Sequence, residues 1–204
     1  MDILGIDEAG RGSVLGPMVI AGVIVPEKMD KVLERMGVKD SKRITPNRRT
    51  ILSRKLKKMF EYEIVIISAR EIDELRAKGV NLNEIEKNAM ESIILKLKPE
   101  KSIVDAVDVK AERFQENLCK DTGCNVVAEH KADDKYIEVG AASIIAKVER
   151  DNYINEINKE YIKSGGIGSG YPSDPATKKF LTNFTYDEMP DFVRKSWATV
   201  AKMK

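Results

Sequence analysis

The feature of this sequence that most constrains the fold is a short apolar run, 3–6, that ends directly in two adjacent carboxylates, Asp7 and Glu8. Such a run is typical of a buried strand, and acids at its end are costly unless positive charge lies against them. A divalent metal ion is the usual partner. The Gly-Arg-Gly segment that follows, 10–12, offers bare backbone N–H groups to a sugar or phosphate. The pattern predicts metal-dependent phosphodiester chemistry, with a solvated turn as the alternative for the acidic pair.

The composition sets looser bounds. The 204 residues fit one large domain, or one domain with a small appendage, and 42% hydrophobic residues suffice for a core. The 33% charged residues indicate a water-soluble protein, and no run approaches the roughly 20 apolar residues that cross a membrane. The start of the chain lacks the features of a signal peptide, so we expect a cytoplasmic protein. Cys119 and Cys124 are not spaced as a CxxC pair, so we expect reduced cysteines and no zinc.

The charges are nearly balanced overall but unevenly distributed. The formal net charge of +2 does not by itself indicate a nucleic-acid binder. Basic residues cluster within 39–58, where Asp40 is the one acid. A solvated helix face is the ordinary interpretation of such a run, and contact with phosphates is the alternative.

Apolar periodicity predicts an α/β fold with a helical end. The run 18–25 is apolar without alternation, which suits a strand buried on both faces, and the short connection from the first strand favours an antiparallel hairpin. Further strands are expected at 63–67, 102–104 and 126–128. We expect helices at 46–60, 83–97 and 136–161, and another that begins at Pro175 with Asp174 as its cap, after a glycine-rich loop at 164–170.

Acidic residues follow several of these strands. Asp105 ends the strand at 102–104, and Asp133 lies in a loop that leads into the long helix. Ligands of open α/β sheets collect at the carboxyl ends of strands, so these acids meet Asp7 and Glu8 if the first strand neighbours the one at 102–104. An oxygen-only ligand set matches magnesium or manganese.

Spacing alone leaves alternatives open at each of the later positions. Asp108 competes with Asp105, which is favoured because it directly follows the predicted strand, and Asp134 competes with Asp133 on nearly equal terms. His130, the single histidine, is either a general base or ligand in the same loop or a packed or capping residue.

Six motifs occur in a fixed order over nearly the whole chain, and together they resemble the ribonuclease HII family, most closely its single-subunit archaeal members. They are Gly5-Ile6-Asp7-Glu8-Ala9-Gly10-Arg11-Gly12 with Gly16-Pro17, Val38-Lys39-Asp40-Ser41-Lys42, Val104-Asp105, His130-Lys131-Ala132-Asp133, Ala141-Ala142-Ser143-Ile144-Ile145-Ala146-Lys147-Val148, and Gly168-Ser169-Gly170-Tyr171-Pro172-Ser173-Asp174-Pro175.

The resemblance implies a ribonuclease H-like fold, in which helices flank a central mixed β-sheet and a small helical part follows. We expect a catalytic domain at 1–163 and a C-terminal loop and helical subdomain at 164–204. The resemblance also selects among the acids: Asp7, Glu8, Asp105 and Asp133 match the catalytic, metal-binding tetrad of the family, whereas Asp108 and Asp134 do not.

The implied activity is hydrolysis of the RNA strand of RNA–DNA hybrids and cleavage on the 5′ side of ribonucleotides embedded in duplex DNA. Two Mg²⁺ or Mn²⁺ ions would activate a water and neutralise the leaving oxygen, giving 3′-hydroxyl and 5′-phosphate ends. Selectivity for RNA must depend on the 2′-hydroxyl. We expect a monomer that binds these duplexes and no membrane.

The resemblance also assigns substrate-binding residues. Those that sense the ribonucleotide are Gly10, Arg11, Gly12 and Tyr171, and those near the scissile region or the backbone are Lys42, Ser143 and Lys147. Arg150 shares a helix face with Ser143 and Lys147, a face suited to following phosphates. Without the resemblance, Tyr171 is an ordinary loop anchor. Arg194 and Trp197 fall in a segment of family type, and packing is the expected role of Trp197.

Two other classes fit part of the pattern. An exonuclease or resolvase of the same broad fold shares clustered acids but lacks the Gly-Arg-Gly motif paired with a late tyrosine. A non-catalytic nucleic-acid-binding protein on the same fold would have no need of all four acids.

Overall fold

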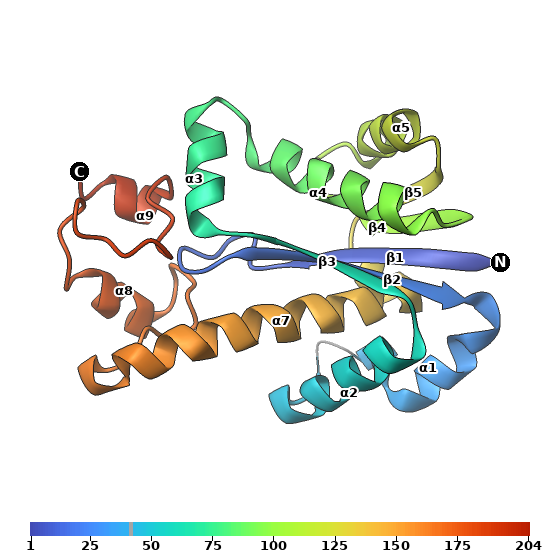
Figure 1. The fold of residues 1–204 in the computed structure, drawn as a ribbon, viewed down its shortest axis with the longest axis horizontal. Helices are drawn as coiled ribbons and strands as arrows, with labels where there is room; N and C mark the ends of the chain where they lie inside the picture. Colours follow the sequence, from blue (N-terminus) through green and yellow to red (C-terminus); the bar gives the residue numbers. More distant parts are fainter. Residues whose placement is uncertain (41–42) are drawn as a thin grey trace. The chain divides into compact units, whose positions relative to one another are not determined.

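The structure is a computed structural model that describes residues 1–40 and 43–204, so Lys42 lies outside the described residues. One sheet contains the five strands of the described ranges, in the order β3-β2-β1-β4-β5 (Figure 1). The strands are β1 (Asp2–Ala9), β2 (Met18–Pro26), β3 (Tyr62–Ile67), β4 (Lys101–Asp105) and β5 (Asn125–Glu129). β1 pairs in parallel with β4, and β4 pairs in parallel with β5. Because β2 runs opposite to β1 in Figure 1, the sheet is mixed.

The sheet confirms the strands predicted from the apolar runs. It also confirms the neighbour relation on which the predicted site depends, because Ile6 of β1 is in register with Val104 of β4. The residues that follow these two, Asp7 and Asp105, therefore reach the same edge of the sheet. This edge is the carboxyl end of both parallel strands, where α/β proteins bind their ligands.

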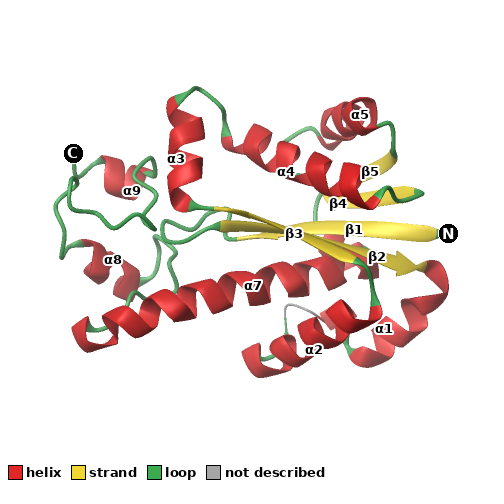
Figure 2. Ribbon diagram, viewed as in Figure 1, coloured by secondary structure: helices red, strands yellow, loops and turns green. Residues whose placement is uncertain are grey.

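Helices connect the strands except β1 and β2, which are joined by a loop, as the colouring of Figure 2 shows. The α-helices are α1 (Asp30–Met36), α2 (Pro46–Met59), α3 (Ala69–Ala77), α4 (Leu82–Leu97), α5 (Ala111–Thr122), α6 (Ala132–Lys135), α7 (Ile137–Tyr161), α8 (Pro175–Leu181) and α9 (Ala198–Ala201), and short 3-10 turns lie at Glu27–Met29, Val38–Asp40 and Ile162–Ser164. The long predicted helices correspond to α2, α4 and α7. The apolar periodicity did not predict α1, α3, α5, α6 or α9, and Asp133, which was expected in a loop, lies in α6.

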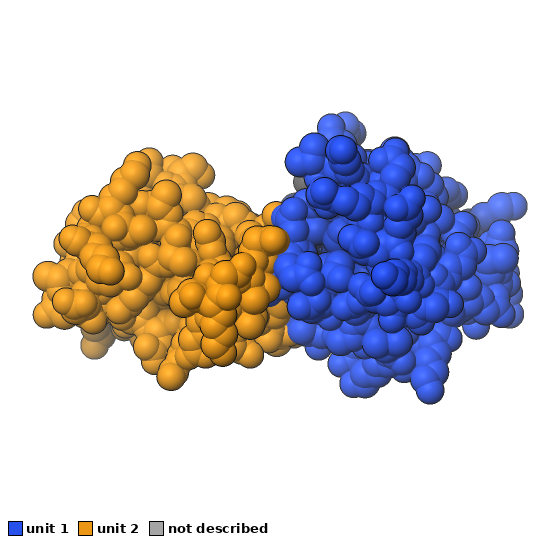
Figure 3. Space-filling view, turned by 90° about the horizontal axis from the view of Figure 1, so that it is seen from above, with its two compact units in different colours: residues 1–9, 20–65, 83–148 blue, residues 10–19, 66–82, 149–204 orange. Residues whose placement is uncertain are grey.

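The described part of the chain forms two compact units (Figure 3). Unit 1 contains 1–9, 20–65 and 83–148, and unit 2 contains 10–19, 66–82 and 149–204. The chain crosses between them several times, and α7 belongs to unit 1 up to Val148. The division into domains at 163 and 164 stays a prediction.

In unit 1, helices cover both faces of the sheet, with α4 and α5 on one face and α1, α2 and the start of α7 on the other (Figure 1). The approach of α7 depends on Gly5, since a Cβ there would lie 2.2 Å from the carbonyl carbon of Glu138. On the opposite face, Gly22 of β2 makes room for Ile93 of α4. These glycines let α7 and α4 pack directly against β1 and β2, respectively.

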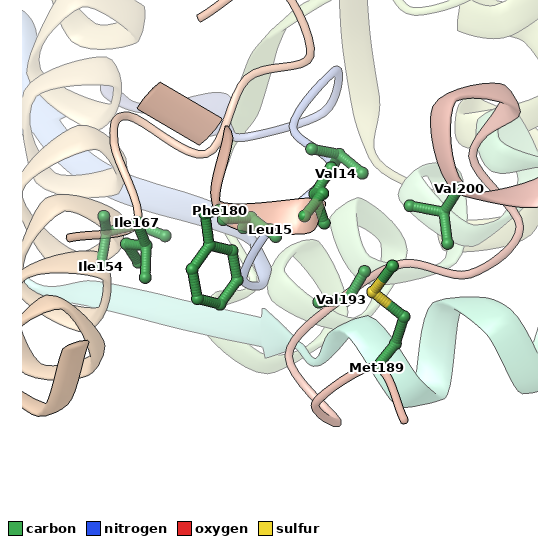
Figure 4. Close-up of a cluster of buried hydrophobic side chains, with 9 residues drawn as sticks. Val14, Leu15, Ile154, Ile167, Phe180, Met189, Val193 and Val200 are labelled. Atoms are coloured by element: carbon green, nitrogen blue, oxygen red, sulfur yellow. The ribbon is translucent and has the colours of Figure 1, made fainter. Parts of the chain in front are cut away.

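Unit 2 has its own hydrophobic core, shown in Figure 4. Its buried side chains are Val14, Leu15, Ile154, Ile167, Phe180, Leu181, Met189, Val193 and Val200. Aromatic rings extend this cluster, for example Tyr161, which meets Phe180 edge to face at a centroid distance of 5.0 Å. The segments 10–19 and 149–204 are thus joined by apolar packing. Among the described residues, no helix is both long and apolar enough to span a membrane.

Candidate active site

Three carboxylates meet where the two central parallel strands end. Asp7, Glu8 and Asp105 each offer an oxygen atom, and these atoms lie within 4.8 Å of one another. Asp7 is buried, with 5% of its surface exposed, and the other two are half-buried. Among the described residues, these form the group of acids or other metal-ligating side chains that is compact enough to hold one ion.

The electrostatics of this group are unfavourable without a cation. Burial raises the pKa of Asp7 well above its usual value, and the charges of Glu8 and Asp105 add to the rise. Two hydrogen-bonding groups partly compensate: the backbone N–H of Glu8 donates to Oδ1 of Asp7 at 2.8 Å, and the side chain of Ser143 lowers the same pKa. The protein thus holds a buried acid that ionises readily only when positive charge is supplied.

Asp105 is oriented by the loop that follows β5. The backbone N–H of Ala132 donates to Oδ1 of Asp105 at 2.8 Å. Lys131 precedes it with a φ of +57°, a left-handed conformation that is uncommon for a residue with a side chain. Burial raises the pKa of Asp105, the nearby charge of Asp133 raises it further, and the N–H of Ala132 lowers it. A strained backbone position therefore helps to fix one of the three acids.

The other acidic candidates, Asp133, Asp108 and Asp134, do not belong to this group of three. Asp133 is half-buried in α6 and falls outside the group of three, although its charge acts on Asp105. Asp108 is instead engaged by Arg113, whose Nε donates to it at 2.9 Å, and this contact lowers its pKa. Asp134 is exposed and, together with Asp133, lines a separate pocket. The structure thus brings Asp105, not Asp108, to the site.

His130 is exposed, and its Nε2 lies 3.3 Å from the carbonyl oxygen of Val109. Its charge lowers the pKa of Asp105, so it is close to the acidic group without being one of its members.

Ser143 and Lys147 lie one turn apart on α7, beside the acids. Nζ of Lys147 donates to the hydroxyl of Ser143 at 2.8 Å, and Ser143 in turn acts on the pKa of Asp7. Ser143 is fully buried and Lys147 is half-buried. The hydroxyl group of Ser143 thus links the cation of Lys147 to the most buried acid, Asp7.

Arg150, one turn further along α7, does not continue this face to solvent, and the expectation that it follows phosphates is wrong. Its side chain is buried, and its Nη2 donates to the hydroxyl of Ser13 at 2.7 Å and to the carbonyl of Ser169 at 3.1 Å. Its guanidinium group lies over the ring of Tyr171, 4.8 Å from the centroid. Tyr171 itself remains 37% exposed.

The two glycines around Arg11 differ in what the fold requires of them. Gly10 has a φ of +82°, and a Cβ there would lie 2.5 Å from Cδ of Arg150 and 2.8 Å from the carbonyl oxygen of Pro17. A Cβ at Gly12 would meet nothing within 4 Å among the described residues, and Gly12 is exposed. Folding therefore demands glycine at position 10, whereas the open space beside Gly12 leaves room for a ligand.

The part of the basic cluster from 48 to 58 lies on α2, whose buried side consists of Leu52, Ser53 and Leu56. Arg48, Arg54, Lys55 and Lys58 are exposed. Either interpretation of the sequence, solvated face or phosphate contact, is compatible with this exposure.

Sequence reasoning missed one residue that bears on the site. Arg194 was given no role, yet it is fully buried against the backbone of the loop 10–16. No local pattern around Arg194 signals this, because its partners lie at the other end of the chain.

The donor set of the acidic group suits a divalent metal ion. Its ligand atoms are carboxylate oxygens, which Mg²⁺ and Mn²⁺ favour over zinc-type nitrogen and sulfur ligands. The mutual repulsion of the acids, visible in the raised pKa values, would be relieved by such a cation. The residues present therefore fit a bound divalent metal.

Comparison with known proteins agrees with this fold. The family model of ribonuclease HII matches residues 4–200. The chain is 81% identical over 204 residues to the ribonuclease HII of Methanobrevibacter smithii, covering all of this chain and 99% of that protein.

Two solved structures share the whole fold. The ribonuclease H2 of Pyrococcus horikoshii superposes with a TM-score of 0.89 at 41% identity, over 100% of this chain and 97% of that one. The ribonuclease HII of Archaeoglobus fulgidus, solved in complex with PCNA, gives a TM-score of 0.88 at 44% identity, over 97% and 95% of the two chains.

The site and the fold thus define a metal-dependent nuclease on a ribonuclease H-like sheet. The chain belongs to the ribonuclease HII family, whose members degrade RNA in RNA–DNA hybrids with the help of a divalent metal.

Proposed function

We propose that this enzyme cleaves not only RNA–DNA hybrids but also duplex DNA on the 5′ side of single embedded ribonucleotides, leaving 3′-hydroxyl and 5′-phosphate ends by two-metal-ion hydrolysis. The observation that carries the proposal is the compact group of Asp7, Glu8 and Asp105 at the end of two parallel strands. Magnesium or manganese, when bound, would activate the attacking water and neutralise the departing 3′-oxygen.

The acids of the site hold and orient the metal in this proposal. Asp7 and Asp105 are fixed by backbone N–H groups, at 2.8 Å each, and are the ligands best placed to hold metal in one position. Glu8 completes the group of three. Asp133 acts from just outside it, where its charge reaches Asp105 and where it can steer bound water.

Cations and glycines on the same chain would bind the substrate. Lys147 would bind a phosphate, and its hydrogen bond to Ser143, which acts on Asp7, supports this role. Gly10, Arg11 and Gly12 would recognise the 2′-hydroxyl, since the space beside Gly12 is open. The exposed ring of Tyr171 would lie against the neighbouring sugar. Lys42, which lies outside the described residues, is proposed to contact the backbone of the nucleic acid. A monomer suffices, because all of these residues come from one chain.

The test compares two duplexes of identical sequence, one all-DNA and one with a single ribonucleotide, in the presence of Mg²⁺ or Mn²⁺. We expect one cut, 5′ of the ribonucleotide, and none in the all-DNA duplex. End-labelling of the products should give a 3′-hydroxyl and a 5′-phosphate, and a chelator should abolish the reaction. Equal cutting of both duplexes, or activity that survives the chelator, would refute the proposal.

A further inference from the structure

The side chain of Arg194 forms hydrogen bonds with the backbone of the loop that follows β1. Its Nη2 donates to the carbonyl oxygen of Gly10 at 2.7 Å, its Nη1 to that of Arg11 at 2.9 Å, and its Nε to that of Gly16 at 3.0 Å. Nε1 of Trp197 lies 3.4 Å from a fourth carbonyl oxygen, that of Gly12. Two side chains from the C-terminal segment thus engage the carbonyls of three consecutive residues.

These contacts fix where the N–H groups of the same loop point. A peptide unit is planar and trans, so its N–H is directed away from its C=O. Because the carbonyls of Gly10 and Arg11 are turned toward Arg194, the N–H groups of Arg11 and Gly12 are turned away from it. Those two N–H groups belong to the segment that we propose to contact the 2′-hydroxyl.

Packing alone does not explain why a charged side chain occupies position 194. The side chain is fully buried, and burial together with the charge of Arg150 lowers its pKa to about 9, so it stays protonated at neutral pH. A buried cation is costly, and an apolar side chain of similar size often packs as well or better. Its three hydrogen bonds to the loop go to carbonyl oxygens, so what the guanidinium adds is the orientation of the backbone.

The segment that carries Arg194 is itself anchored. The carboxylate of Asp73, in α3, accepts from the backbone N–H groups of Lys195 at 2.7 Å and Ser196 at 3.0 Å. The ring of Trp197 lies 4.7 Å from the guanidinium carbon of Arg194. Arg194 therefore reaches the loop from a rigid support.

Arg150 holds Tyr171, the other residue that we propose to recognise the ribonucleotide, in a comparable way. Its Nη2 bridges Ser13, in the same loop, and Ser169, and its guanidinium lies over the ring of Tyr171. The hydroxyl of Ser13 also donates to the carbonyl oxygen of Gly170 at 2.8 Å. The loop and Tyr171 are thus joined through one buried arginine.

We propose that Arg150 and Arg194 are positioning residues for ribonucleotide recognition, with Arg194 fixing the direction of the loop N–H groups and Arg150 fixing the ring of Tyr171. The inference rests on the proposed function of that loop. It also accounts for two buried cations that lie close enough for one to lower the pKa of the other.

The test measures discrimination rather than activity. Dissociation constants are determined for a duplex with one ribonucleotide and for the same all-DNA duplex, with Ca²⁺ in place of the catalytic metal. Arg194→Lys keeps the charge but loses the three-way fork. We expect the ratio of the two constants to fall about tenfold, the scale of one charge-assisted hydrogen bond, with all-DNA affinity unchanged within about twofold.

The matched control is Met189→Ala, which weakens the core of unit 2 without removing any of the hydrogen bonds from Arg194 to the loop. It should lower the melting temperature and leave the ratio unchanged. Trp197→Phe removes the indole N–H that contacts Gly12 and keeps an aromatic ring beside Arg194. It should lower the ratio by about threefold, and it tests the proposal if Arg194→Lys does not fold.

A double-mutant cycle tests Arg150. Arg150→Lys should lower the ratio in the wild-type background and have no further effect in Tyr171→Ala, because both changes remove the same ring geometry. Additive effects would overturn the assignment of Arg150.

The outcomes separate this inference from the proposed function. If the wild-type protein binds both duplexes equally, the proposed recognition of the ribonucleotide is wrong. If the wild type discriminates and Arg194→Lys discriminates equally well, only the positioning role is wrong. The same holds if Met189→Ala lowers the ratio of the dissociation constants as much as Arg194→Lys does.

Discussion

The acidic group of unit 1 and the loop 10–16 of unit 2 differ in whether the chain itself compensates their buried charge. In the first, Asp7, Glu8 and Asp105 repel one another, and the pKa values of Asp7 and Asp105 are raised. In the second, the buried cation Arg194 is matched by carbonyl oxygens at 2.7–3.0 Å. One region needs a ligand to be electrostatically satisfied, and the other is satisfied by the chain itself.

This difference teaches what each region contributes. An acidic group that is unfavourable alone binds a divalent cation strongly, because binding relieves the repulsion. A loop whose carbonyls are already engaged presents its N–H groups in one direction and needs no rearrangement to bind. Changes in the first region should therefore alter chemistry and spare the fold, whereas changes in the second should alter recognition and, at some positions, the fold.

The largest effect is expected at the acidic group. Asp7→Asn should lower kcat by about 10³-fold or more, with little change in affinity for a hybrid duplex, because the carboxylate acts through the metal. Single-turnover cleavage and binding, measured in parallel, give the two quantities. Asp108→Asn is the matched control, since Asp108 is engaged by Arg113 outside the group, and should retain activity within about threefold. Comparable losses in both variants would break the distinction between these acids.

The next effect concerns Tyr171. Tyr171→Ala should reduce cleavage at an isolated ribonucleotide by about tenfold through loss of ring contact with the sugar. The melting temperature should change little, because the ring is 37% exposed. Tyr153→Ala, which removes another exposed ring of unit 2, serves as the control and should leave cleavage unchanged. A fall in melting temperature that matches the loss of activity would instead make Tyr171 a structural anchor.

Substitutions of Gly10 and Gly12 compare, within the same loop, a glycine that the fold requires with one that the substrate requires. Gly10→Ala should lower the free energy of unfolding by about 1–3 kcal/mol, because its φ is positive and a Cβ would meet Arg150 and Pro17. Gly12→Ala should change it by less than about 0.5 kcal/mol and still reduce ribonucleotide cleavage. Chemical denaturation and cleavage rates of both variants provide the check. Equal loss of stability in the two would show that the fold requires both glycines.

The smallest effect is a dependence of stability on pH in the metal-free protein. Since the pKa of Asp7 is raised in the folded state, its favourable contribution is complete below the unfolded value of about 3.9 and is lost as pH rises through the folded value. Asp7→Asn should therefore match the wild type near pH 4 and melt higher at pH 7, by about 2–4 °C for each kcal/mol. Mg²⁺ should stabilise the wild type and leave the variant unaffected. A difference that shrinks as pH rises would show that the pKa of Asp7 is not raised.

Much of the fold could be predicted because its signals are local. Apolar runs identified the strands, and the long amphipathic patterns identified α2, α4 and α7. The helix α3 was missed although a capping box marks its start, in which Ser68 and Glu71 bond reciprocally. Its nine residues give too few turns for a clear periodic stripe.

The candidate site was predictable in part for a related reason. Acids at strand ends stand out in the sequence, and parallel pairing of β1 with β4 brings two of them to one edge. The position of Asp105 directly after a predicted strand favoured it over Asp108, and the structure confirms that choice. The pairing of Asp108 with Arg113 was not predicted. Arg150 was misjudged because helical spacing gives a shared face but not which end of that face is buried.

By itself, the sequence determined the strands, the long helices, the supply of carboxylates at the strand ends and the glycines of the loop. Tertiary structure alone decided that Asp133 lies outside the group of three, that Arg150 is buried, and that Arg194 is bonded to a loop 184 residues away at Gly10. The reason is physical: secondary structure depends on interactions within a few residues, whereas burial of a charge and the partner that compensates it depend on how distant segments pack together.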